Sequence, residues 1–303
     1  MFEGEAKNLS EVEKLFKKFL RDKQFISNLS ATTLKSYEKD VFGRWKRLVG
    51  KEMPTAENLD DFVIEMRQGN LSVTTCNISI RSFNSFLSWL HSKGHIQTPL
   101  KIAKLKEEKK IMQTFSDEQL RSVLTWKPVN HYEWRFFAMF CVLMDTGVRV
   151  NECLTVQADG IDFDNLLMKV TGKGSKERIV PFSIELRKVL YTYASKHRNP
   201  HFKSAYFFCT RNGTKMSYHH FWKVFRKMCK DFDINHKDIS GAFHAFRRKF
   251  GRNYLKQGGN LLYLQKIFGH EDLATTQRYI EVESKDLEVT HLRTSLVSRL
   301  KKK

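Results

Sequence analysis

The sequence predicts a mainly α-helical protein with one small antiparallel β-sheet, built as an N-terminal helical bundle and a C-terminal α+β domain. Three observations support this prediction. Apolar residues recur at helical spacing from residue 9 to about residue 95. This periodicity fades over residues 98–114, where polar and charged residues are frequent. The pattern shortens to that of strands over residues 160–182, and helical spacing then resumes.

Composition narrows the class of protein. The 303 residues are enough for two domains, each with its own core, and the 41% of hydrophobic residues include 24 Phe. Lys and Arg outnumber Asp and Glu by 53 to 33, which gives a net charge of +20. Such an excess favours a polyanionic partner such as nucleic acid, or else a ribosomal-type, generally basic protein. A membrane partner is not expected, because no segment stays apolar for about 18 residues.

The cysteines and the N-terminus point to an intracellular protein. The five cysteines have irregular spacing, with no CxxC pair and no His/Cys cluster. This pattern supports neither a disulfide framework nor a zinc site, and no metal is expected. The first residues are charged and lack the apolar core of a signal peptide. We therefore expect a cytoplasmic protein with reduced thiols.

Four helices account for residues 1–97. Ser30 or Thr32 is expected to cap the second helix, Pro54 opens the third, and the fourth runs from about Ser72 to Ser92. The apolar faces of the four predicted helices comprise Val12, Leu15, Phe16, Phe19 and Leu20; Leu34, Tyr37, Val41, Trp45 and Leu48; Leu59, Phe62, Val63 and Met66; and Cys76, Ile80, Phe83, Leu87 and Leu90. Four helices with short connections predict a bundle.

Residues 98–114 are expected to link the two domains. Lys101, Lys104 and Lys106 lie in this segment. They either keep a tether soluble or contact phosphates of a duplex that both domains clasp, and the sequence leaves both interpretations open.

The second domain is expected over residues 115–303. Ser116 and Gln119 form a capping-box pattern, and a strongly apolar helix follows over residues 134–145. Three short antiparallel strands are predicted within residues 161–163, 166–170 and 179–180. Helices resume after residue 183, and glycines interrupt them at positions 213, 241, 258, 259 and 269.

Two residues in the C-terminal third form the first candidate phosphate ligands. His244 and Arg247 lie three residues apart on a predicted helix, so their side chains emerge on one face. An arginine can bind two phosphate oxygens in a fork, and a neighbouring histidine can donate a hydrogen bond or relay a proton. The pair also fits an ordinary solvated helix face beside Arg248.

Three further charged residues lie upstream. Arg149 follows a glycine that is expected to end a helix, so its guanidinium can reach into a cleft as a second phosphate ligand. Glu152 is placed to orient that guanidinium, or is a surface carboxylate. Lys173 lies at the tip of the second hairpin, where it can protonate a leaving oxygen or face solvent.

Tyr279 and His270 complete the candidate set. A phenol has a pKa of about 10, so it attacks phosphorus only when its proton is removed and the phosphate charge is neutralised. The two arginines and two histidines supply those functions. A single tyrosine on a helix is otherwise most often a packing residue.

Four motifs occur in the order TGVR with NE, GKGSKERIVP, HAFR, and GHEDLATTQRY. They resemble the motifs of the tyrosine recombinase, or phage integrase, family and span residues 145–282. The segment SATTLKSYEKDV resembles the second helix of the family's SAM-like core-binding domain, so the resemblance covers nearly the whole chain. It implies a core-binding domain, a catalytic domain, and an exchange tail from about residue 286 that docks on a neighbouring protomer or on its own domain.

The resemblance also implies roles for individual residues. Tyr279 corresponds to the nucleophile and Glu152 to a supporting acidic residue. The remaining catalytic positions correspond to Arg149, Lys173, His244, Arg247 and His270. Two departures, Arg248 where relatives often carry His and Asn151 where Ser or Gly is common, concern substrate detail, and Arg248 is a candidate DNA contact.

The implied activity is site-specific DNA recombination through a 3′-phosphotyrosyl intermediate and a Holliday junction, as in an integrase or resolvase of a mobile element. The expected partners are double-stranded DNA with specific core sites, a homotetramer, and an accessory DNA-bending protein, with the protein on the nucleoid when it binds DNA. No cofactor is expected. The alternatives are a type IB topoisomerase-like activity and a DNA-binding regulator without catalysis. The predicted bundle and tail disfavour the first, and the complete residue set disfavours the second.

Overall fold

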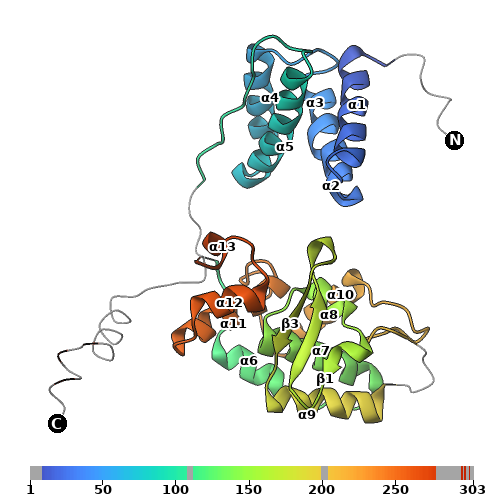
Figure 1. Cartoon of the computed structure of the whole chain (residues 1–303), viewed down its shortest axis with the longest axis vertical. Coiled ribbons are helices and arrows are strands. Elements are labelled where there is room, and N and C mark those ends of the chain that lie inside the picture. Colours follow the sequence, from blue (N-terminus) through green and yellow to red (C-terminus); the bar gives the residue numbers. More distant parts are fainter. Residues whose placement is uncertain are drawn as a thin grey trace. The chain divides into compact units, whose positions relative to one another are not determined.

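The computed structural model describes residues 9–107, 112–198 and 204–277, together with Ser295, Val297 and Leu300. The side chains of Asp40, Lys173 and Ala274 lie outside this description. The chain divides into two compact units, with the division between Lys110 and Ile111 (Figure 1). The predicted fold class, mainly α-helical with a small antiparallel sheet, is confirmed.

The first unit is a set of helices around an aromatic core. Its elements are α1 (Glu11–Phe25), α2 (Ala31–Ser36), a π-helical segment (Tyr37–Phe42), α3 (Gly43–Leu48), α4 (Ala56–Gln68) and α5 (Val73–Ser92). The rings of Trp45 and Phe83 stack in the centre, with centroids 4.7 Å apart, and Phe62 packs on both. Ser30, and not Thr32, caps the second helix, which is continuous from residue 31 to residue 48 apart from the wider π-helical turn.

The segment after α5 packs along that helix. Asn77 exchanges hydrogen bonds of 2.8 and 2.9 Å with the backbone of Leu105, and Asn84 does the same with Ile102. These asparagines are seven residues apart, about two helical turns, so the segment runs beside the helix. Residues 100–105, which the sequence predicts as linker, therefore contribute to the first unit, and Ile102 is buried in its core.

The second unit is mostly helical. Its elements are α6 (Asp117–Leu124), α7 (His131–Thr146), α8 (Val150–Thr155), a 3-10 turn (Ala158–Gly160), β1 (Ile161–Asp162), β2 (Leu167–Thr171), a 3-10 turn (Lys173–Ser175), β3 (Glu177–Pro181), α9 (Ile184–Thr192), a π-helical segment (Tyr193–His197), α10 (Tyr218–Asp231), α11 (Phe243–Lys256), α12 (Leu261–Phe268) and α13 (Leu273–Gln277). None of the described helices has both the length and the apolar character that crossing a membrane requires.

Helix α7 is the centre of this unit. Buried side chains follow one another along most of its length, and it packs against α9 and α11. Its start at His131 is three residues earlier than predicted, because the side chain of Asn130 accepts a hydrogen bond of 3.0 Å from the Glu133 N–H. The predicted capping box of Ser116 and Gln119 is present at the start of α6.

The three strands form a meander in the order β1-β2-β3, with antiparallel pairing throughout. Leu167 pairs with Pro181 and Thr171 with Glu177, so the second hairpin turns at residues 172–176. Because side chains alternate across a strand, Arg178 lies on the same face of β3 as the buried Val180.

Candidate active site

The turn between α7 and α8 positions Arg149. Gly147 ends α7 with φ of +61°, a conformation that glycine adopts without strain. A Cβ at this position would also lie 2.7 Å from Cδ1 of Phe250 and 2.9 Å from Cε1 of Phe268. Arg149 then occupies the cap position of α8, and its backbone N–H donates to Glu152 Oε2 at 2.7 Å.

Glu152 is a buried carboxylate between two arginines. Its side chain is 2% exposed and accepts from Arg149 Nη1 at 2.9 Å. Burial by itself raises the pKa of this carboxyl, but the hydrogen bonds from Arg178 and from the Arg149 backbone outweigh burial and hold the pKa below its ordinary value. Of the two interpretations that the sequence leaves open, the orienting carboxylate is the one that the structure shows.

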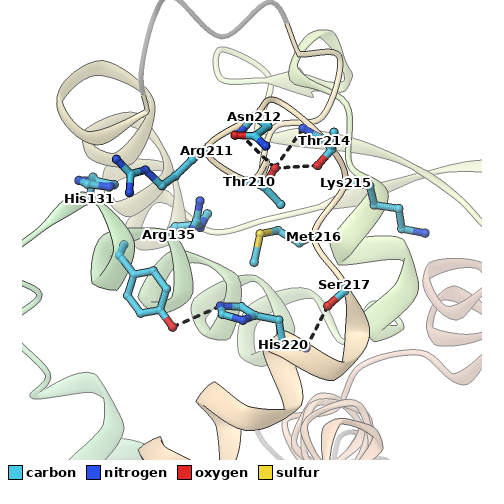
Figure 2. A pocket seen from close by; sticks show the side chains of 11 residues that line it. His131, Arg135, Thr210, Arg211, Asn212, Thr214, Lys215, Met216, Ser217 and His220 are labelled. Carbon is cyan, nitrogen blue, oxygen red and sulfur yellow. Dashed lines mark hydrogen bonds between the residues drawn. The ribbon is translucent and has the colours of Figure 1, made fainter.

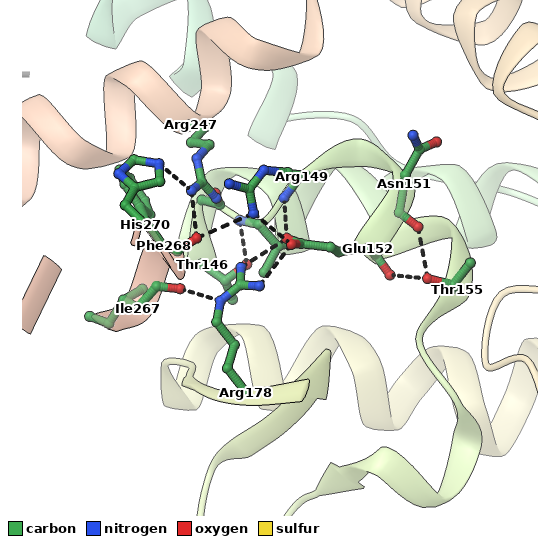
Figure 3. Close-up of polar contacts among 12 residues, drawn as sticks. Thr146, Arg149, Asn151, Glu152, Thr155, Arg178, Arg247, Ile267, Phe268 and His270 are labelled. Carbon is green, nitrogen blue, oxygen red and sulfur yellow. Dashed lines mark hydrogen bonds and ion pairs between the residues drawn. The ribbon is translucent and has the colours of Figure 1, made fainter. Parts of the chain in front are cut away.

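Arg178 is the member of the cluster that sequence reasoning missed. It forms a fork with Glu152, through bonds of 2.7 and 2.8 Å, and its Nε donates to the carbonyl of Ile267 at 2.7 Å (Figure 3). The available signal is its position two residues before Val180, which puts a charge on the buried face of a strand. Arg178 thereby connects the hairpin strand β3 with α8 and with the end of α12.

Arg247 lies on α11 and is buried, with 2% of its surface exposed. Its Nη1 donates to the carbonyl of Gly147 at 2.9 Å, and its Nη2 donates to the carbonyl of Phe268 at 2.8 Å. The guanidinium carbon also lies 3.9 Å from the centroid of the Phe268 ring. A solvated helix face is therefore wrong for Arg247.

Arg149 and Arg247 converge on one backbone atom. Arg149 Nη1 lies 3.3 Å from the Phe268 carbonyl oxygen, which also accepts the Arg247 bond (Figure 3). Phe268 ends α12, and Gly269 follows with φ of +62°. The two guanidinium groups, far apart in the sequence, are thus held side by side.

His270 is held between Arg247 and Thr276. Arg247 Nη2 lies 3.0 Å from Nε2 of the imidazole, and Thr276 Oγ1 lies 2.8 Å from Nδ1. Since a guanidinium can only donate, Nε2 is the acceptor and Nδ1 carries the proton. Burial, followed by the charges of Arg247, Arg149 and Arg178, lowers the pKa of His270 to about 4. Thr276 is fully buried and was not anticipated from the sequence.

The lowered pKa of His270 predicts that the free energy of unfolding changes with pH. An unfolded chain protonates histidine near about pH 6.5, whereas folded His270 has a pKa of about 4. Between those values the unfolded state binds more protons, so the contribution of His270 to stability is complete above about pH 6.5 and is lost as the pH falls toward 4. We expect urea unfolding at several pH values to show wild type losing stability relative to His270→Gln across this window. A difference that stays constant from pH 7 to pH 5 contradicts this assignment.

His244 and Arg248 lie in the first turns of α11. His244 is exposed as a whole residue, but neighbouring protein atoms partly desolvate its ring. This desolvation, followed by the charges of Arg247, Arg248 and Arg149, lowers the pKa of His244. Arg248 Nη2 donates to the carbonyls of Ser240 and Gln113, and the distance to Gln113 is 3.3 Å. Arg248 therefore holds the loop before α11, and its DNA contact stays a prediction.

The remaining predicted residues are placed only in part. The backbone of Lys173 lies at the hairpin tip, as expected, and its side chain is outside the description. Tyr279 and the tail from residue 286 also lie outside the described residues, apart from the isolated positions named above. In the first unit, Lys101, Lys104 and Lys106 are exposed, and Lys104 Nζ lies 3.7 Å from Glu107 Oε1.

The central cluster is suited to an anion. Arg149, Arg178 and Arg247 bring three positive charges, and Glu152 brings one negative charge, so the four side chains keep an excess of two positive charges. Arginine pairs in this arrangement recognise phosphate oxygens and stabilise charge that develops on them.

Comparison with known proteins defines the class. The sequence model of the phage integrase family matches residues 106–286, more than half of the chain. The chain belongs to this family and is a tyrosine recombinase, as its motifs predict. Tyrosine recombinase XerD of Listeria monocytogenes serotype 4b (strain F2365) is 29% identical over 278 residues, which cover 84% of this chain and 89% of the relative.

Two further similarities agree. Tyrosine recombinase XerC of Anoxybacillus flavithermus is 27% identical over 293 residues, which cover 90% of this chain and 95% of the relative. Among solved structures, the Tn1549 transposon integrase in complex with a circular intermediate DNA has a TM-score of 0.77 at 18% identity, covering 94% of this chain and all of that one, 100%. The structural likeness supports the fold.

Proposed function

We propose that this tyrosine recombinase cleaves and rejoins duplex DNA at specific core sites, with Tyr279 as the nucleophile. The observation that carries the proposal is the convergence of Arg149 and Arg247 on the Phe268 carbonyl, at 3.3 and 2.8 Å. Two adjacent guanidinium groups with fixed positions are the arrangement that a pentavalent phosphorane needs. The XerD relative and the DNA complex of the Tn1549 integrase support DNA as the substrate.

The proposed step is a transesterification. The Tyr279 oxygen loses its proton and attacks the scissile phosphorus, and the bond from phosphorus to the 5′ oxygen breaks. Lys173 donates a proton to that leaving oxygen, while Arg149 and Arg247 neutralise the equatorial oxygens. The product is a 3′-phosphotyrosyl bond and a free 5′-hydroxyl.

The histidines complete this mechanism. His270 is held by Arg247 and Thr276 beside the guanidinium pair, and His244 lies one helical turn before Arg247. The two ring nitrogens of His270 bond Arg247 and Thr276, so this ring orients the Arg247 guanidinium. The exposed His244 can exchange a hydrogen bond or a proton with a phosphate bound there. The phosphotyrosyl bond conserves the energy of the broken diester, so the reverse attack by a 5′-hydroxyl of a partner strand needs no nucleotide.

The proposed number of protomers follows from strand exchange. Two strands at each of two sites require four protomers, and exchange of the first pair gives a Holliday junction. We infer that the first unit clamps the duplex, that Lys101, Lys104 and Lys106 contact its phosphates, and that the tail docks on a neighbouring protomer. The relatives are named recombinases, which favours strand exchange over topoisomerase-like relaxation. An integrase or resolvase of a mobile element, assisted by a DNA-bending protein, is the role we propose.

The test is capture of the covalent intermediate. The protein is incubated with nicked suicide duplexes made from the DNA that flanks its gene, so that religation is prevented. We expect a protein–DNA adduct, and nuclease and trypsin digestion should leave the nucleotide remnant on the peptide from Tyr279 to Lys285, since trypsin cuts after Arg278. An adduct on another peptide excludes Tyr279 as the nucleophile.

Absence of an adduct on every tested duplex contradicts the proposed cleavage of those substrates. A supercoiled plasmid without the core sites distinguishes the alternative, because relaxation of such a plasmid indicates a topoisomerase-like activity.

A further inference from the structure

A basic hollow lies at the start of α7, whereas Arg149 follows the end of that helix. It measures about 500 Å³ and is lined by the first turns of α7 and α10 and by the loop over residues 210–217 (Figure 2). Helix α7 rises about 1.5 Å per residue, so its first residue lies roughly 22 Å from its last. The hollow is therefore distinct from the candidate active site.

Arg135 forms the floor of this hollow. The residue is 7% exposed, and its Nη1 donates to the carbonyl of Cys209 at 2.6 Å. Its Nε has no hydrogen-bond partner, and no carboxylate of the described residues forms an ion pair with it. The faces of Tyr132 and Phe136 lie 5.6 and 5.3 Å from the guanidinium carbon and compensate the charge only in part. A buried charge without a counter-ion is costly, so this position stabilises an incoming anion.

The rim adds two exposed cations. Thr210 closes a tight turn, since its N–H donates to the Thr214 carbonyl at 2.8 Å and the two hydroxyl oxygens are 2.7 Å apart. Arg211 lies within this turn, Lys215 follows it directly, and both are exposed. Among the described residues that line the hollow, none is Asp or Glu. The rim therefore presents positive charge to an anion that approaches from solvent.

The start of α10 adds further positive electrostatic potential to the hollow. Ser217 caps this helix through a bond of 3.1 Å from the His220 N–H, and the helix N-terminus points its partial positive charge at the hollow. His220 Nε2 lies 3.3 Å from the Tyr132 hydroxyl. Burial and the neighbouring charge of Arg135 lower the pKa of His220, so this ring is neutral at neutral pH and can donate or accept a hydrogen bond.

We propose that this hollow binds a phosphate group of the DNA backbone, with Arg135 at its floor and Arg211 and Lys215 at its rim. The proposal rests on the proposed function, because it takes duplex DNA as the ligand. A backbone phosphate is the source that the geometry favours over a free phosphate ion. The hollow is open to the surface and its two rim cations are exposed, so they can reach a phosphate that remains attached to a long polymer.

The test is the salt dependence of DNA binding. Affinity for a duplex that carries the core site is measured by fluorescence anisotropy over a series of salt concentrations. Each neutralised phosphate contributes about 0.9 to the slope of log K against log salt concentration. We expect the Arg211→Gln/Lys215→Gln double variant to lower the magnitude of that slope by about one and to weaken binding. Arg135→Met should act in the same direction, and thermal melting shows whether it is folded.

Lys188→Gln is the matched control, because Lys188 is an exposed cation on α9, outside the hollow. A slope of the double variant equal to those of wild type and Lys188→Gln overturns the proposal. A second arm compares thermal unfolding in inorganic phosphate and in sodium chloride of equal ionic strength. Stabilisation by phosphate that the double variant loses, combined with an unchanged DNA slope, assigns the hollow to free phosphate and contradicts the DNA ligand.

The two proposals fail separately. Binding does not require cleavage. If wild type forms no adduct, but the double variant shows the expected lower slope relative to wild type, only the recombination chemistry is contradicted. A wild-type protein that forms the Tyr279 adduct, with no slope change in the double variant, contradicts only the phosphate site.

Discussion

Replacement of Arg247 by lysine is expected to slow formation of the covalent DNA adduct by at least ~100-fold, which corresponds to about 3 kcal/mol of lost transition-state stabilisation. Lysine keeps the positive charge but has no planar fork. It cannot donate at once to the carbonyls of Gly147 and Phe268 and to His270, as Arg247 does at 2.8 to 3.0 Å. Lysine is therefore expected to lose both the proposed phosphate contact and the orientation of His270.

The measurement is the single-turnover rate of adduct formation with saturating suicide duplex. Arg121→Lys on α6 is the matched control, since Arg121 is exposed and lies 3.9 Å from Glu118. Thermal melting establishes that Arg247→Lys is folded, and Arg149→Lys, at a side chain that is 36% exposed, provides a second variant if it is not. A folded Arg247→Lys protein that reacts within about tenfold of wild type contradicts the role of Arg247 in stabilising the transition state.

Replacement of Glu152 by alanine is expected to destabilise the second unit by about 3–5 kcal/mol. The carboxylate accepts from the backbone and side chain of Arg149 and, in a fork, from Arg178, all at 2.7 to 2.9 Å. Its loss leaves two guanidinium groups next to each other with no anion between them. Surface ion pairs, by contrast, contribute about 0–1 kcal/mol.

Glu177→Ala is the control for this comparison. Glu177 is an exposed residue of β3, and its carboxylate lies 3.5 Å from Lys169 Nζ. Chemical denaturation of both variants at neutral pH gives the two free energies of unfolding. Equal losses for Glu152→Ala and Glu177→Ala contradict the central role of the buried carboxylate.

Local signals in the sequence predicted much of the fold. The capping box of Ser116 and Gln119, and the serine at position 30, place helix starts where the structure has them, because a side-chain acceptor for the free N–H groups is a local requirement. The three strands also follow from their local pattern. The hydrogen bonds between Asn77 and the Leu105 backbone could not be predicted from the sequence. Residues 98–114 are polar and lack apolar periodicity, so nothing in them indicates that a distant asparagine binds their backbone.

The candidate site also has features that the sequence predicts and features that it does not. Motif spacing identifies Arg149 and Arg247 as candidates, but it also allows a solvated face for Arg247 and a surface position for Glu152. Arg178 escaped notice because its partner, Glu152, is 26 residues away. Whether a charge is buried, and which group it pairs with, depends on residues that only folding brings near.

Helix caps, strand alternation and motif spacing are properties of neighbours along the chain. They are therefore sufficient to predict the fold class, the family and the candidate residue types. The burial of Glu152 between two arginines depends on packing in three dimensions, and so does the Phe268 carbonyl that Arg149 and Arg247 share. The contact between Arg149 and Phe268 spans 119 residues. A hydrogen bond of this kind exists because packing of α7, α11 and α12 places its partners within reach, and no local pattern carries that information.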